Sequence, residues 1–194
     1  MNRLARILAS AAALMLAGCS SVPLTSIPRL ARIDAKTTDL SMLRVAVQLP
    51  EVLRPRSGGI KLDVVTKVAG EAEAKTSFSM MEMSEQRDGA DLPPPPLGSA
   101  IRAYALSPAD AARFETLRAA MVEHGRQGRR GSMGLGVAAK EFCRANAAPQ
   151  SALPVTIYLM TSETQSFVAV VKDFDLLGDP ALAGGLDSIR PCGQ

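Results

Sequence analysis

The sequence contains no tryptophan, and its aromatic side chains amount to 2 Tyr and 5 Phe. Proteins that bind single-stranded nucleic acid stack bases on such rings, and carbohydrate-stacking surfaces use them in the same way. Charge of one sign is not in excess either, because 22 Lys and Arg stand against 19 Asp and Glu. A nucleic-acid partner calls for a strongly basic surface. The composition therefore argues against nucleic acid and against a carbohydrate-stacking surface.

Histidine is almost missing, since His124 is the only one in the chain. A metal site built on several histidines is excluded by count. A serine hydrolase of the usual kind would need a histidine beside a serine on a sharp turn, and the sequence has no G-x-S-x-G motif. We therefore predict no catalytic residue, no resident metal and no cofactor, and we expect a protein that is not an enzyme.

No apolar run is long enough to cross a membrane. The longest, Ile7 to Ala17, is broken only by Ser10 and has about eleven residues, whereas a spanning helix needs roughly twenty. Arg3 and Arg6 precede the run, and small residues follow it. A basic start, a short apolar core and small residues before a cleavage site are typical of a secretory signal peptide.

The run ends in Leu16-Ala17-Gly18-Cys19, which resembles the lipobox of bacterial lipoproteins. The resemblance covers residues 1–19 only. It implies cleavage before Cys19, a diacylglycerol on the thiol of that residue and, in most members, a third acyl chain on the new amine. Ser20 stands where an aspartate would favour the inner membrane, so the outer membrane, with the domain facing the periplasm, is the expected location. Two or three acyl chains anchor a protein almost permanently.

The sequence predicts three segments: a cleaved signal peptide (1–18), a lipidated cysteine with a tether (19–40), and a single domain (41–194). Ser, Thr, Pro and isolated charges between Ser20 and Leu40 favour a partly ordered linker, although Arg29 to Ile33 could form a short basic turn on a phospholipid surface. The remaining chain has the length of one ordinary domain.

Two cysteines remain once Cys19 is acylated. Cys143 and Cys192 form an even pair in an oxidising compartment, which predicts a disulfide, with two free buried thiols as the alternative. Their spacing excludes a C-x-x-C redox motif.

The pattern of apolar residues predicts an α+β domain in the order βββ-β-αα-ββ, in which an antiparallel sheet of about six strands carries two helices on one face. Alternating apolar residues indicate the strands. Ser107 and Pro108 are typical of a helix start, and Gly125 of a helix end. A second helix is expected from about Ser132, because apolar side chains recur there at i, i+3, i+4, i+7 and i+8: Leu135, Ala138, Ala139, Phe142 and Cys143. The strands are expected at 45–49, 60–64, 75–85, 101–106, 154–160 and 167–172.

Two features are weak candidate sites. Arg126, Arg129 and Arg130 lie in a glycine-rich connection (125–136) that could bind an anion, from phospholipid, lipopolysaccharide or an acidic partner surface, although a flexible solvated connection between two helices is the simpler interpretation. The thioethers of Met81 and Met83 project to one face of a predicted strand and could hold Cu(I), although core filling by methionine is the simpler interpretation.

These observations predict a membrane-anchored envelope lipoprotein that acts as a non-catalytic binding or assembly factor, with an envelope protein as its partner. The alternative is a periplasmic carrier of a small ligand, either a lipid or Cu(I). An enzyme of another class is the third hypothesis.

Overall fold

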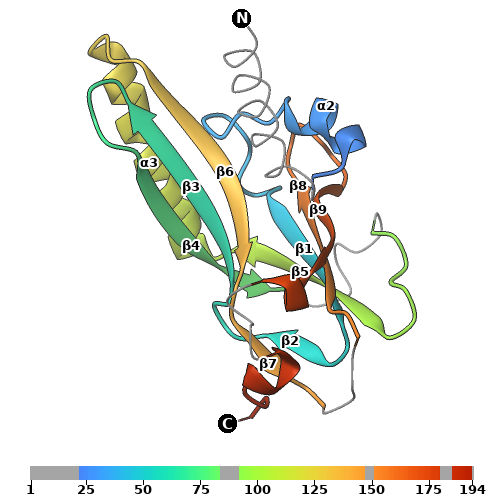
Figure 1. The fold of residues 1–194 in the computed structure, drawn as a ribbon. Helices are drawn as coiled ribbons and strands as arrows, with labels where there is room; N and C mark the ends of the chain where they lie inside the picture. The colour runs from blue at the N-terminus through green and yellow to red at the C-terminus, as the bar shows by residue number, and fades with distance from the viewer. Residues whose placement is uncertain (1–21, 84–91, 147–150, 180–184, 194) are drawn as a thin grey trace, which may run out of the picture.

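The computed structural model describes residues 22–83, 92–146, 151–179 and 185–193. An antiparallel sheet of seven strands curls around the core, and one long helix covers part of it (Figure 1). The strands are β1 (Arg44–Pro50), β2 (Leu53–Pro55), β3 (Ile60–Val68), β4 (Ala74–Glu82), β5 (Ser99–Leu106), β6 (Gly131–Ala139), β7 (Phe142–Arg144), β8 (Pro154–Met160) and β9 (Val168–Asp175). The helical segments are η2 (Leu24–Ser26), α2 (Ile27–Leu30), α3 (Pro108–Arg126), η3 (Leu176–Gly178) and η5 (Gly185–Ser188).

The strand order in the large sheet is β6-β3-β4-β5-β1-β8-β9, and β2 and β7 form a separate small sheet. The expected α+β class is confirmed, with seven strands in the main sheet rather than about six. Strand β4 joins the two halves, because residues 74–79 pair with β3 while Met80, Met81 and Glu82 pair with β5. The sheet therefore curls at β4.

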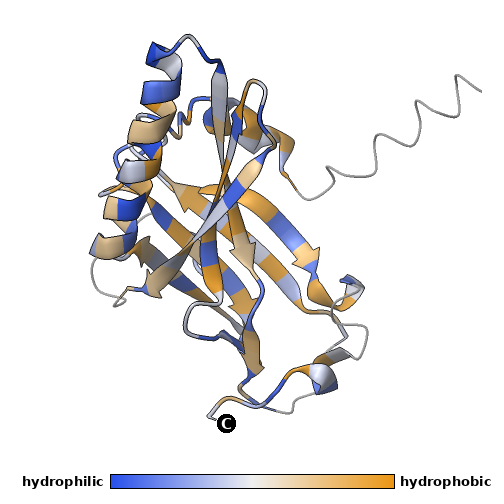
Figure 2. Ribbon diagram, turned by 90° about the vertical axis from the view of Figure 1, so that its left-hand side faces the viewer, coloured by the Kyte–Doolittle hydropathy of each residue, from blue (hydrophilic) through white to orange (hydrophobic). Residues whose placement is uncertain are grey.

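The core lies inside this curl. Val45 and Val47 of β1 and Leu62 and Val64 of β3 are almost completely buried, as their alternation predicts. Apolar residues dominate the central strands, whereas α3 carries mixed polar and apolar residues (Figure 2). This distribution places most of the burial in the sheet.

Helix α3 begins and ends near the predicted positions. The Ser107 hydroxyl accepts a hydrogen bond from the Asp110 amide at 3.0 Å, and Pro108 occupies the first turn. The Phe114 ring stacks on Phe78 of β4 with 5.3 Å between ring centres. This stack fixes the helix against the sheet.

The second predicted helix is wrong. Residues 131–139 form strand β6, which pairs with β3 along its whole length. Inward residues alternate with exposed Ser132, Gly134 and Gly136, which is the two-residue period of a strand. The helical spacing from Leu135 onward is coincidental, because Gly134 and Gly136 weaken a helix while β3 offers a full row of backbone partners.

The segment expected to be a tether is folded from Leu24 onward, so the domain begins well before residue 41. Ala35 and Thr38 are 3% and 0% exposed. The Thr38 hydroxyl donates to Glu163 Oε2 at 2.8 Å. Burial raises the pKa of Glu163, but hydrogen bonds from Thr161 and Thr38 outweigh it and hold that pKa below its usual value. The ionised carboxylate thus fastens the segment to the β8–β9 turn.

Strand β1 separates two ends of the molecule. Arg44 follows the N-terminal segment and pairs with Met160, whereas Pro50 pairs with Ser99 and leads into β2. At about 3.3 Å per residue the strand spans roughly 20 Å. Segment α2 and the C-terminus lie toward opposite ends in Figure 1. No helix within the described residues is long and apolar enough to cross a membrane.

Candidate functional site

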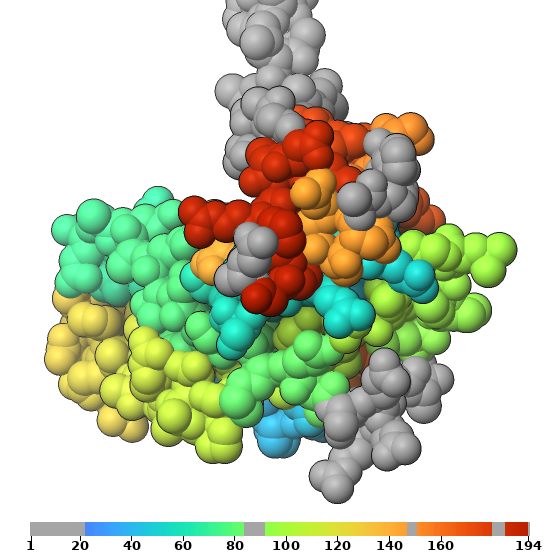
Figure 3. Space-filling model, turned by 90° about the horizontal axis from the view of Figure 1, so that it is seen from below, coloured from blue at the N-terminus to red at the C-terminus, as the bar shows by residue number. Residues whose placement is uncertain are grey.

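The end of the molecule away from α2 is built from the β2–β7 sheet and the C-terminal segment. Leu53 pairs with Arg144 and Pro55 with Phe142. The Arg144 amide donates to the Arg190 carbonyl at 2.9 Å, and the Cys192 amide donates to the Arg144 carbonyl at 3.0 Å. Figure 3, which looks onto this end, shows the C-terminal segment (red) lying against the β2 region (cyan) and the β7 region (orange).

A disulfide between Cys143 and Cys192 closes this arrangement and confirms the predicted pairing. The two cysteines are 49 positions apart, and their Cα atoms lie 4.9 Å apart. An ion pair adds a further contact, because Arg144 Nη1 lies 2.8 Å from Asp187 Oδ1. The C-terminal segment is therefore fixed covalently to a strand of the domain.

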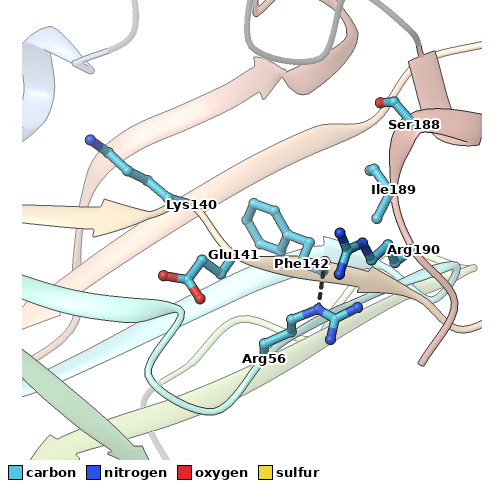
Figure 4. Close-up of a pocket in the computed structure, with 7 residues that line it drawn as sticks. All are labelled: Arg56, Lys140, Glu141, Phe142, Ser188, Ile189 and Arg190. Atoms are coloured by element: carbon cyan, nitrogen blue, oxygen red, sulfur yellow. Dashed lines mark hydrogen bonds between the residues drawn. The ribbon is translucent and has the colours of Figure 1, made fainter. Parts of the chain in front are cut away.

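An open hollow of about 360 Å³ lies beside the disulfide (Figure 4). The residue after β2, the β6–β7 junction and the C-terminal segment provide its walls, with Phe142 and the nearly buried Ile189 as apolar surface. The full set of lining residues is Arg56, Lys140, Glu141, Phe142, Ser188, Ile189 and Arg190. We call this the distal hollow.

Positive charge predominates in the distal hollow, with three basic side chains against one acidic side chain. Glu141 is already engaged, since its Oε1 lies 3.3 Å from Lys61 Nζ outside the hollow. Figure 4 shows the guanidinium groups of Arg56 and Arg190 turned toward the same side of Phe142, while the Lys140 side chain points away. The hollow therefore presents two guanidinium groups.

Arg56 carries the most telling feature of the site. Its amide donates to the Glu141 carbonyl at 2.8 Å and its Nε to the Phe142 carbonyl at 3.3 Å, so the side chain is held in place. Its Nη2 is buried and has no hydrogen-bond partner among the described residues. A buried donor without an acceptor costs about 1–3 kcal/mol. Because Nη2 has almost no surface open to solvent, an anionic oxygen in the hollow would reach it only after a turn of the Arg56 side chain. Guanidinium groups bind carboxylate and phosphate with two parallel hydrogen bonds.

The three arginines of the predicted patch differ in their surroundings. Arg126 lies 3.6 Å from Glu123, and Arg129 lies 2.5 Å from Glu71 and 3.2 Å from His124 Nδ1. Arg130 is exposed beside a shallow hollow at the start of β6. Two of the three cations are thus paired within the protein.

The three methionines at the end of β4 and just after it differ in how far they are exposed to solvent. Met81 is 52% exposed, Met83 is half-buried, and Met80 points into the core. Met81 lines a hollow of about 460 Å³ together with Tyr104.

Burial raises the pKa of the Tyr104 hydroxyl, and the negative charge of Glu82 raises it further, so this hydroxyl stays protonated. Within the described residues, no group of three His, Cys, Asp or Glu side chains could hold a metal ion.

Sequence reasoning missed Arg56, Lys140 and Arg190. They are far apart in the chain, and no local motif joins them. One signal was present: the predicted disulfide brings Arg190, two positions before Cys192, close to Phe142, one position before Cys143. Nothing in the sequence placed Arg56 there, because β2 is a three-residue strand.

Cys19 lies outside the described residues. No protein-family model, no curated protein and no solved structure matches the chain.

Proposed function

We propose that this protein is a lipid-anchored component of the cell envelope, and that its domain binds acidic side chains of a partner protein in the distal hollow. Cys19 would carry the acyl chains, and the domain would face the periplasm from the outer membrane. The role is one of binding or assembly rather than catalysis.

The anchor is supported by the lipobox-like Leu16-Ala17-Gly18-Cys19 after a short apolar run. The disulfide is consistent with an oxidising compartment such as the periplasm. The distal hollow and the N-terminal segment lie toward opposite ends of β1, a strand of roughly 20 Å. A site at that distance from the anchor faces other envelope proteins more readily than the lipid that holds the chain.

The single observation that carries the binding role is that two guanidinium groups, those of Arg56 and Arg190, line one hollow, and that Nη2 of Arg56 has no acceptor among the described residues. An acidic side chain would satisfy this donor and neutralise both cations. The apolar surface of Phe142 and Ile189 strengthens the attraction, because charge pairs gain from an environment of low dielectric constant.

The binding test uses the full-length protein and a hexaglutamate peptide as the probe, followed by titration calorimetry at low and at physiological salt. We expect salt-sensitive binding by the native chain and a loss of at least tenfold in affinity in an Arg56→Gln/Arg190→Gln variant, equivalent to about 1.4 kcal/mol. Arg54→Gln is the matched control, since Arg54 is exposed and lines a different hollow.

Inorganic phosphate serves as the second probe. Binding of phosphate but not of hexaglutamate would assign the hollow to a phosphate-bearing ligand and overturn the proposed protein partner. Equal peptide binding by all three proteins would overturn the site itself. The anchor is tested separately by mass spectrometry of the exported chain, where an unmodified thiol at Cys19 would contradict it.

A further inference from the structure

The N-terminal helical segment, Leu24–Leu30, exposes apolar side chains and buries a polar one. Leu24 is 82% exposed and Ile27 is 48% exposed, whereas Ser26 is 6% exposed. Pro28 and Ala31 are exposed as well. These four exposed residues follow the spacing i, i+3, i+4 and i+7, so they share one side of the segment. We call this side the α2 face.

The α2 face is fixed relative to the rest of the domain. Arg29 Nη1 contacts Ser166 Oγ at 3.4 Å, Ile33 packs against the core, and α2 contacts β9. Just beyond it, the buried Arg118 side chain donates to the carbonyls of Ala35 and Thr38 at 2.9 and 2.6 Å. The apolar side chains are therefore held outward by the fold and are not part of a loose tail.

Basic charge accompanies the α2 face. Between Val22 and Ile33 the sequence has two arginines, Arg29 and Arg32, and no acidic residue. Both arginines are exposed, and neither forms an ion pair with another described residue. A short helix with apolar side chains on one side and basic residues beside it is typical of segments that lie in a membrane interface.

The distance to the anchor is short. Cys19 is three residues before Val22, and three fully extended residues span at most about 11 Å. The headgroup layer of one leaflet is about 5–7 Å thick. Acyl chains on Cys19 would thus hold Val22 within about one or two headgroup thicknesses of the hydrocarbon, with the α2 face immediately after it.

We infer that the α2 face inserts into the headgroup layer of the leaflet that holds the acyl chains, with Arg29 and Arg32 against anionic headgroups. This inference rests on the proposed lipid anchor. An inserted α2 face orients the domain, because β1 leads away from this end toward β2 and the distal hollow. The acyl chains and the α2 face then attach the protein to the leaflet at two points, so the domain cannot rotate freely about the anchor.

The test places a thiol-reactive NBD fluorophore on Leu24→Cys in the full-length lipidated protein, reconstituted in phosphatidylethanolamine–phosphatidylglycerol vesicles. Acylation of Cys19 and the Cys143–Cys192 disulfide leave the new thiol as the one available for labelling. Leu24 is exposed enough for the label not to disturb packing. Leu97→Cys is the matched control, because Leu97 is fully exposed and lies two positions before Ser99, which pairs with Pro50 at the far end of β1.

We expect a blue shift of the Leu24→Cys emission on reconstitution and its loss when a lipid with a nitroxide near the headgroup is included. The Leu97→Cys emission should stay unchanged in both conditions. If both variants float with the vesicles but their emissions are alike, the inference is overturned while the anchor stands. If neither variant floats, the anchor is wrong, and the inference falls with it.

Discussion

The buried guanidinium of Arg118 joins the N-terminal segment to helix α3. It donates to two backbone carbonyls of that segment, lies 2.8 Å from Glu115 Oε1 and stacks 4.7 Å above the Phe114 ring. Arginine serves here better than lysine, because its planar group can make several directed hydrogen bonds and a ring contact at once. One charged side chain in the middle of α3 therefore holds residues 35–38 against the domain, in a segment for which the sequence had predicted a linker.

Replacing this side chain tests its role. Arg118→Met keeps the aliphatic stem but leaves the carbonyls of Ala35 and Thr38 buried without a donor, so we expect a loss of about 2–4 kcal/mol in the free energy of unfolding. Arg113→Met is the control, since Arg113 lies 5.2 Å from the Phe78 ring but its side chain is 61% exposed. That change should stay below about 1 kcal/mol. Urea unfolding measures both, and similar losses would contradict the bridging role.

Strand β6 shows why elements are harder to assign than single residues. Its sequence satisfies both a helical stripe and a strand alternation, and the choice depends on β3, which lies about seventy positions earlier in the chain. Strands β1 and β3 were predictable because each alternates clearly, β1 up to Pro50 and β3 from the residue after Gly59, and β8 because a β-rich run follows Pro154. The N-terminal segment was not predictable, because its burial depends on contacts with Arg118 and the β8–β9 turn.

The junction between β2 and β3 contains a position where only glycine fits. A Cβ atom at Gly59 would collide with the Glu141 carbonyl oxygen and lie 3.0 Å from that of Arg56. Both neighbours are backbone atoms, so Gly59→Ala should lower the free energy of unfolding by about 2 kcal/mol. Because the clash displaces the wall of the distal hollow, hexaglutamate affinity should fall as well.

Gly134→Ala is the control for this substitution. Gly134 lies in β6 with no atom within 4 Å of its would-be Cβ. Its replacement should change stability by no more than about 0.5 kcal/mol and leave peptide binding intact. Thermal unfolding and calorimetry on both variants decide the matter, and an undisturbed Gly59→Ala protein would show that the junction can relax.

At the scale of the whole molecule, the disulfide holds a loop of about fifty residues closed. The chain-entropy model assigns about 4 kcal/mol to such a loop. We expect a Cys143→Ala/Cys192→Ala variant to lose about 2–4 kcal/mol in urea unfolding while keeping the sheet. Peptide binding should be lost with it, because the segment that carries Arg190 is no longer fixed. Retained affinity in the folded variant would show that Arg190 is not needed.

The distal hollow could not be predicted because it belongs to no single element. Its parts come from a three-residue strand, a junction between strands and a segment held by a covalent bond, and their chemistry emerges only when the chain has folded. The disulfide itself was predictable from composition and compartment, because two cysteines left few alternatives. The contacts between distant segments that form the hollow could not be predicted from local sequence propensity.

Strand β1 has a mechanical consequence. Its two ends lie on opposite sides of the domain, and its hydrogen bonds to β5 and β8 run perpendicular to its length. A pull between the bilayer and a captured protein would act along the strand, so that these bonds share the load in shear instead of opening one after another. The strand that separates the two ends would thereby let the domain carry tension without unfolding strand by strand.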